Sequence, residues 1–196
     1  MDGPYRPIWE LAKPLLDTRD NIVHTTIAYS FALKLLEVEG GDEEVVVPAI
    51  LVHDTGWKSI PPEQHLKAFG PGNVDLSLNR VHEEEGAKRA REILGQVDYD
   101  PQLTEQIVEI VLGHDSRKEA LSLNDAIVKD SDKLWRFSAE ALEIDPKRFR
   151  IDPAVHAEWL AHRIDGWFFT ETAKKLAREE QRRRAEYYGP PKRKDS

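Results

Sequence analysis

Residues 49–57 read AILVHDTGW, an apolar run that ends in the doublet His53-Asp54. The run extends back through Val45-Val46-Val47-Pro48, and its periodicity alone does not separate a buried helix from a strand. Pro48 argues against a central strand because proline has no N–H for the sheet ladder, whereas proline is accepted in the first turn of a helix. No second strand candidate exists to pair with this segment. We therefore predict a buried helix that ends at His53-Asp54.

The rest of the chain also carries helical patterns. Apolar residues recur at helical spacing from Asn21 to Val38, with Asp17 or Asp20 as the N-cap and Gly40-Gly41 as the stop. A loop rich in Pro and Gly, residues 59–79, interrupts the pattern. Further helices are expected over about 83–94, from Asp100-Pro101 to about 113, over 125–142 with Asn124 as the cap, and as a pair over about 155–188 after breaks at Pro146 and Pro153. The predicted fold class is all-α, a single-domain helical bundle.

Composition excludes several classes of protein. The chain has 196 residues, about the length of one domain, and its net charge of −8 excludes a general polyanion binder. It has no cysteine, which rules out disulfides, thiolate metal sites and cysteine nucleophiles and fits a reducing compartment. No apolar stretch approaches the roughly 20 residues of a membrane helix, and prolines interrupt the N-terminal segment where a signal core would lie. We expect a cytoplasmic protein with no membrane or nucleic-acid polymer as partner.

Several polar residues fall where apolar residues would be less costly. His24 lies on the apolar stripe of its predicted helix, His114 follows Ile107 and Val111 at helical spacing, and Asp132 continues the stripe of Val128. A buried carboxylate without a partner costs several kcal/mol, so such residues need a cation or hydrogen-bond donors. Imidazoles and carboxylates that converge from separate helices form the donor set of a divalent metal ion, and bundle cores commonly hold such sites.

In this order the residues resemble the HD superfamily of metal-dependent phosphohydrolases. The matching segments are NIVH at 21–24, AILVHDTGW at 49–57 and KDSDKLW at 129–135, within roughly residues 20–140. The resemblance implies an all-helical HD-domain fold with metal ligands at His24, His53, Asp54 and one late aspartate. Helix periodicity does not choose between Asp130 and Asp132. Asp132-Lys133-Leu134 has the family's usual form, so Asp132 is preferred, with Asp130 as its neighbouring partner or the alternative.

Two more histidines match the members of this superfamily that bind two ions. His82 in HEEEGA and His114 stand where such members hold a second ion, with Asp54 as the bridge. His114-Asp115 is itself a doublet, but its place in the order and the preceding Gly113 make it a poorer match than His53-Asp54. The resemblance implies one or two divalent metal ions per chain and leaves Fe, Mn, Co, Ni, Zn and Mg unresolved. No role is assigned to the remaining histidines, His65, His156 and His162.

The implied activity is a phosphohydrolase that cleaves a small, nucleotide-like phosphate ester with a metal-activated water. The alternative is a di-iron oxygenase of the same superfamily that acts on a small polyol or phosphonate, since the ligand types suit both. Asp54 is the catalytic candidate among the ligands. The loop 59–79 joins the doublet to His82 and is expected to form one wall of the substrate pocket. The cations placed to bind phosphate are Lys58, Lys133 and Arg117.

The domain expectation is one HD domain over residues 1–196. Its motif-bearing core is about 20–140, its C-terminal helices about 153–188, and its basic tail 189–196. The C-terminal helices carry Trp159, Trp167, Phe168 and Phe169, apolar surface that either completes the core or pairs with another subunit. The oligomeric state is therefore left open.

Overall fold

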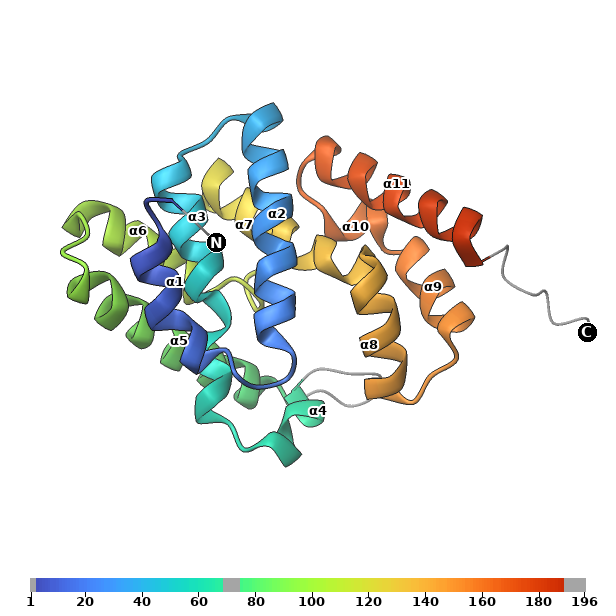
Figure 1. Cartoon of the computed structure of the whole chain (residues 1–196), viewed down its shortest axis with the longest axis horizontal. Coiled ribbons are helices and arrows are strands. Elements are labelled where there is room, and N and C mark those ends of the chain that lie inside the picture. The colour runs from blue at the N-terminus through green and yellow to red at the C-terminus, as the bar shows by residue number, and fades with distance from the viewer. Residues whose placement is uncertain (1–2, 69–74, 189–196) are drawn as a thin grey trace, which may run out of the picture.

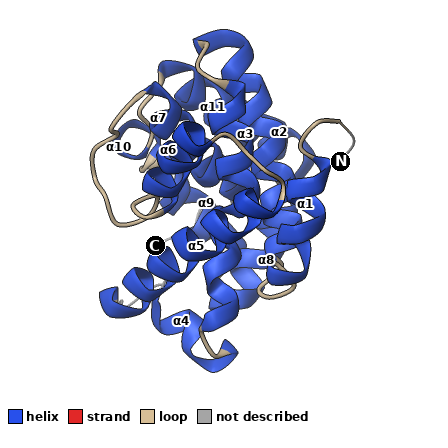
Figure 2. Ribbon diagram, turned by 90° about the vertical axis from the view of Figure 1, so that its left-hand side faces the viewer, coloured by secondary structure: helices blue, strands red, loops and turns tan. Residues whose placement is uncertain are grey.

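The apolar run forms a helix, α3 (Glu43–Val52), in the computed structural model, which describes residues 3–68 and 75–188. Every residue from Val45 to Val52 is buried. The reason is that α3 lies among other helices, which include α1 (Arg6–Ala12), α2 (Asn21–Glu39), α6 (Pro101–Val111) and α7 (Leu123–Leu134), as Figure 1 shows. The described residues contain helices and loops but no strand (Figure 2), which confirms the all-α prediction.

Pro48 lies inside α3, beyond the first turn where proline is usually placed. Because proline has no N–H, the carbonyl of Glu44 loses its helical partner four residues later. The hydroxyl of Tyr99 donates to that carbonyl at 2.6 Å. A side chain from another part of the chain thus satisfies the acceptor that Pro48 leaves unpaired, and the buried helix continues without a break.

The C-terminal part of the chain packs beside α2 and α7 (Figure 1). It consists of α8 (Ala139–Phe149), α9 (Pro153–Ala161), the short α10 (Ile164–Trp167) and α11 (Glu171–Tyr188). The expected helix pair after Pro153 is therefore three helices. Among the described residues, no helix has the length and apolar character needed to cross a bilayer.

The helix that carries His82 begins earlier than predicted. α5 (Leu76–Gln96) starts after Asp75, whose side chain accepts a hydrogen bond from the backbone N–H of Ser77. His82 therefore lies inside the helix, where its side chain is fully buried, and not near the helix start. The loop predicted over 59–79 is also shorter, because a 3-10 turn (Pro62–Gln64) and α4 (His65–Ala68) form within it. Its residues 69–74 lie outside the described residues, as does the predicted basic tail 189–196.

One helix predicted over 125–142 is two. α7 ends at Leu134, a 3-10 turn (Trp135–Phe137) follows, and the side chain of Ser138 caps α8. Pro146 lies inside α8, which continues to Phe149, so the predicted break at this proline is wrong.

Two predicted caps differ in the structure. Ser122, and not Asn124, caps α7, while the Asn124 side chain accepts from the backbone N–H of Asp42 at 2.8 Å. Asp20 holds the N-cap position of α2 without a side-chain capping bond. The stop at Gly40 and the Asp100-Pro101 start are confirmed.

Candidate metal centre

Six side chains singled out in the sequence meet at one place in the core. Five segments contribute them: α2, the 3-10 helix η2 (His53–Ser59) that follows α3, α5, the turn after α6, and α7. Five of the six are buried, and these are four histidines and one aspartate. The side chain of the sixth, Asp132, is 15% exposed. The six are His24, His53, Asp54, His82, His114 and Asp132.

The first group consists of His24, His53 and Asp132. The Nε2 atoms of His24 and His53 lie 2.9 Å apart. The Oδ1 atom of Asp132 lies 3.2 Å from His24 Nε2 and 3.6 Å from His53 Nε2. Two ring nitrogens and one carboxylate oxygen therefore face a common point.

A second group forms around His82 and His114, whose Nε2 atoms lie 3.1 Å apart. Asp54 stands between the two groups. Its Oδ1 atom lies 3.4 Å from His82 Nε2 and 3.8 Å from His114 Nε2. Its Oδ2 atom lies 3.5 Å from His24 Nε2, so the carboxylate reaches both groups.

These separations, from 2.9 to 3.8 Å, are close to those between donor atoms around one metal ion. Ligand atoms about 2.1 Å from a cation lie about 3.0 Å apart at a right angle and about 3.4 Å apart at the tetrahedral angle. The histidine tautomers fit as well. The Nδ1 atom of His53 lies 2.8 Å from the carbonyl of Ile50, and that of His114 lies 2.7 Å from the carbonyl of Val111. An Nδ1–H that donates to a carbonyl leaves the Nε2 lone pair directed at the cluster, as metal-binding histidines require.

The charges of the cluster also favour a cation. Burial alone would raise the pKa of Asp54, but His53 and His24 hold it well below its ordinary value. Burial alone would lower the pKa of His114, but the carboxylates of Asp54 and Asp115 outweigh burial and raise that pKa to about 10. Ionised carboxylates thus face the ring nitrogens and stabilise positive charge among them. A divalent metal ion supplies that charge in place of protons.

Two glycines allow the doublet to approach α5. A Cβ atom at Gly56 would lie 1.9 Å from the carbonyl oxygen of His82 and 2.5 Å from the backbone nitrogen of Gly86. A Cβ at Gly86 would lie 3.1 Å from the carbonyl of His53. η2 therefore runs directly against the α5 backbone, and this contact brings His53 and Asp54 beside His82.

Residues 21–136, more than half of the chain, match the family model of the HD domain. The protein belongs to the HD domain family. The matched residues of this HD domain include all six side chains of the cluster, and the predicted family is confirmed.

A solved structure shows the same fold. The crystal structure of a predicted HD superfamily hydrolase from an uncultured Thermotogales bacterium is 23% identical in sequence, with a TM-score of 0.63. The match covers 94% of this chain and 89% of that chain. At this identity the likeness shows the fold alone. A search of curated proteins found no match.

The turn that carries His114 is held by two buried charged residues that sequence reasoning missed. Glu83 accepts from the backbone N–H groups of Asp115 and Ser116 at 3.0 and 2.8 Å. Lys129 is fully buried and donates to the carbonyls of Gly113, of His114 at 3.1 Å, and of Arg117 at 3.0 Å. The sequence carried one signal for Lys129, because it stands three residues before Asp132 on the same helix face.

Trp57 is a further contact of the centre, and its role was also missed. Its Nε1–H donates to Asp54 Oδ1 at 3.0 Å, and its ring stacks on His82 with centroids 4.2 Å apart. The guanidinium of Arg19 lies 3.5 Å above the Trp57 ring. Trp57 therefore fixes the orientation of Asp54, while Arg19 brings a positive charge close to this HD doublet.

The predicted phosphate-binding cations have different surroundings. Arg117 is committed to the fold, since it donates to Asp125 at 3.0 Å and to the Glu109 carbonyl at 2.7 Å. Lys58 is exposed, and its Nζ donates to the carbonyl of Asp17 at 3.3 Å. Lys133 is half-buried on α7 next to Asp132, with its Nζ 5.7 Å from the Phe169 ring centre. Of the three, Lys133 is the one that directly follows a residue of the cluster.

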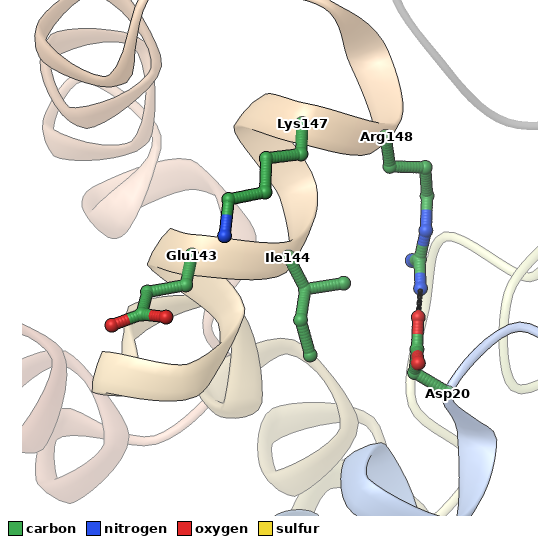
Figure 3. Close-up of a pocket in the computed structure, with 5 residues that line it drawn as sticks. All are labelled: Asp20, Glu143, Ile144, Lys147 and Arg148. Atoms are coloured by element: carbon green, nitrogen blue, oxygen red, sulfur yellow. Dashed lines mark hydrogen bonds and ion pairs between the residues drawn. The ribbon is translucent and has the colours of Figure 1, made fainter.

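An open pocket of about 380 Å³ lies elsewhere, between α8 and the segment before α2. Figure 3 shows Arg148 of α8 directed at Asp20, with their charged atoms 3.0 Å apart. Arg148 also donates to the carbonyl of Arg19. None of the six cluster residues lines this pocket.

The remaining histidines lie apart from the six. His65 Nε2 lies 2.8 Å from the carbonyl of Ile60, His156 is buried beside Asp145, and His162 is exposed.

Proposed function

We propose that this HD domain is a metal-dependent phosphohydrolase that cleaves a small, nucleotide-like phosphate ester. The observation that carries the proposal is the position of Asp54, whose two oxygens face histidines of both groups. Such an arrangement suits a pair of ions a few Å apart, the arrangement found in many phosphatases and nucleases. Membership of the HD domain family supports it, and the similar solved structure is itself described as a hydrolase.

The donor set assigns ligands to two ions. His24, His53 and Asp132 would hold one, His82 and His114 the other, and Asp54 would bridge them. When bound, such ions lower the pKa of a bound water towards neutrality and polarise a phosphoryl oxygen. Nitrogen and oxygen donors without sulfur suit Mn, Fe, Co, Ni and Zn.

The protein residues supply position and charge. Trp57 donates to one oxygen of Asp54 and would hold this carboxylate in one orientation for the ions. Lys133 follows Asp132 directly, and its ammonium group is the first candidate to bind a phosphate oxygen and orient the ester. Lys58, at the end of η2, is the second candidate. Cations so placed favour the phosphoryl group as its charge develops in the transition state.

The test is phosphate release by purified protein without a histidine tag. The protein is loaded separately with Mn²⁺, Co²⁺, Zn²⁺ and Fe²⁺ and assayed against nucleoside mono-, di- and triphosphates and a dinucleotide. His53→Ala, which removes a ligand of the first group, serves as the metal-deficient control. We expect metal-dependent release of phosphate or a nucleotide by the wild type and none above background by the variant. Wild-type protein that binds these metals but releases nothing from the whole panel would contradict the proposal.

The oxygenase alternative relies on the same six residues and is separated by the same preparations. Iron-loaded protein that consumes oxygen in the presence of a polyol or phosphonate, without phosphate-ester hydrolysis, would replace the hydrolase proposal with the oxygenase. Oxygen uptake is measured before and after addition of each compound. The His53→Ala protein is again the control, because it separates oxidation at the centre from oxidation by free iron.

A further inference from the structure

Asp115 faces the second histidine pair from the solvent side. Its Oδ2 atom lies 3.9 Å from His82 Nε2 and 3.9 Å from His114 Nε2, so it is equally distant from the two ring nitrogens. Together the three side chains form a group able to hold a metal ion. The side chain of Asp115 is 37% exposed, whereas both histidines are buried. In the sequence Asp115 is the second residue of the doublet His114-Asp115, which matches the family pattern less well than His53-Asp54 does.

The two groups then have matching composition. Each has two imidazole nitrogens about 3 Å apart, at 2.9 Å for His24 and His53 and at 3.1 Å for His82 and His114. Asp54 lies between them. The first group has a carboxylate of its own, Asp132, whose Oδ1 atom lies 3.2 Å from His24 Nε2 and 3.6 Å from His53 Nε2. In the second group Asp115 is the further carboxylate, and it lies within reach of both histidine Nε2 atoms.

The backbone around Asp115 is fixed in a way that leaves its carboxylate available. Glu83 accepts from the N–H of Asp115 and from both the N–H and the hydroxyl of Ser116. Lys129 donates to carbonyls on both sides of the same turn. Both are buried charged residues. The turn is therefore held from two helices through its backbone, and the Asp115 side chain does not itself hold the turn in place.

We propose that Asp115 is a ligand of the ion held by His82 and His114. This inference rests on the proposed two-ion centre. Each ion then has two histidines, a share of Asp54 and one terminal carboxylate, Asp132 for the first and Asp115 for the second. Three carboxylates offset three of the four positive charges of two divalent ions, so the centre keeps a net positive charge that attracts a phosphate ester.

The experiment is a titration of the apo-protein with Co²⁺. Binding is monitored by calorimetry and by the visible absorption spectrum of bound cobalt. Wild type is compared with Asp115→Asn and Asp115→Ala. Glu119→Gln is the matched control, since it removes a carboxylate from an exposed residue four positions further along the same loop. Circular dichroism and thermal unfolding of the apo-proteins verify that all variants share the wild-type fold.

We expect two ions in the wild type and in Glu119→Gln. In both Asp115 variants we expect the second ion to bind at least about tenfold more weakly, the smallest cost usual for partners that only orient ligands, while the first keeps its affinity. The cobalt spectrum of the second site should change as an oxygen donor is lost. Two ions with wild-type affinities and spectrum in the Asp115 variants would overturn the assignment of Asp115 alone. Failure of the wild type to take up a second ion would overturn the two-ion centre and this assignment together.

Discussion

Asp130 and Asp132 stand two residues apart on α7, but their carboxylates engage different parts of the protein. Asp132 faces His24 and His53. Asp130 is fully buried and accepts from the backbone N–H groups of Phe169 and Thr170, each at 2.9 Å, and from the Thr170 hydroxyl at 2.8 Å. Positions two apart on a helix point about 200° away from each other, which explains the division. Asp130 thus ties α7 to the start of α11, while Asp132 belongs to the candidate metal centre.

Substitution of these two residues should therefore separate stability from metal binding. Asp130→Asn places an amide NH₂ against N–H donors and should lower the free energy of unfolding by about 1–3 kcal/mol without loss of metal. Asp132→Asn should lose the first ion and leave the apo-protein at near wild-type stability. Urea unfolding of the apo-proteins and metal analysis of the loaded proteins measure both effects. Metal loss in Asp130→Asn with full retention in Asp132→Asn would reverse the assignment.

His82 and His114 provide a direct count of the ions. If both bind the second ion, His82→Ala and His114→Ala should each reduce bound metal from two ions to about one. Activity should fall to background in both variants, although both keep their helical circular dichroism signal. Inductively coupled plasma analysis of dialysed protein gives the count. His162→Ala, at an exposed position outside the cluster, is the control and should keep two ions. Two ions in both buried-histidine variants would remove these residues from the centre.

Lys129 should affect the second ion without contact with it. Lys129→Met keeps most of the side-chain length but removes the ammonium group that three carbonyls of the His114 turn share. Breaking a buried charged contact of this kind costs about 3 kcal/mol, because the acceptors stay buried without donors. We expect lower stability in urea and weaker binding of the second ion, with the first ion retained. Lys88→Met, at an exposed position on α5, should change neither quantity. Equal weakening of both ions would show that Lys129 acts on the fold as a whole.

Gly56 tests the close contact between η2 and α5. The Cβ of Gly56→Ala would overlap backbone atoms of His82 and Gly86, and backbone cannot move aside as a flexible side chain can. We expect a loss of at least about 3 kcal/mol of stability, or failure to fold. Gly95→Ala, on α5, is the control, because nothing lies within 4 Å of its Cβ, and it should gain up to about 1 kcal/mol. Thermal unfolding of both proteins decides between a required glycine and a tolerant position.

The sequence indicated the fold because buried helices leave local patterns, whereas it indicated the full cluster through the resemblance to the HD superfamily. The apolar run before His53 and the histidine on the α2 stripe mark buried helices directly, and the six residues are brought together as the family order implied. Glu83 was missed because its partners are backbone N–H groups 32 and 33 residues away, which no local pattern encodes. The early start of α5 was missed because its cap, Asp75, follows a stretch rich in Pro and Gly that suggests a longer loop.

Lys133 separates phosphate binding from metal binding. Lys133 directly follows Asp132, in the segment that faces the centre. Its ammonium group lies near the Phe169 ring. Lys133→Ala should keep both ions but lose about 1.5–3 kcal/mol of transition-state stabilisation, roughly 10- to 150-fold in kcat/KM. Lys58→Ala should have a smaller effect, because Lys58 is exposed and bound to the Asp17 carbonyl. Steady-state kinetics and metal analysis are made on the same preparations. If Lys133→Ala loses metal in proportion to activity, then Lys133 supports the ions and does not bind the phosphate.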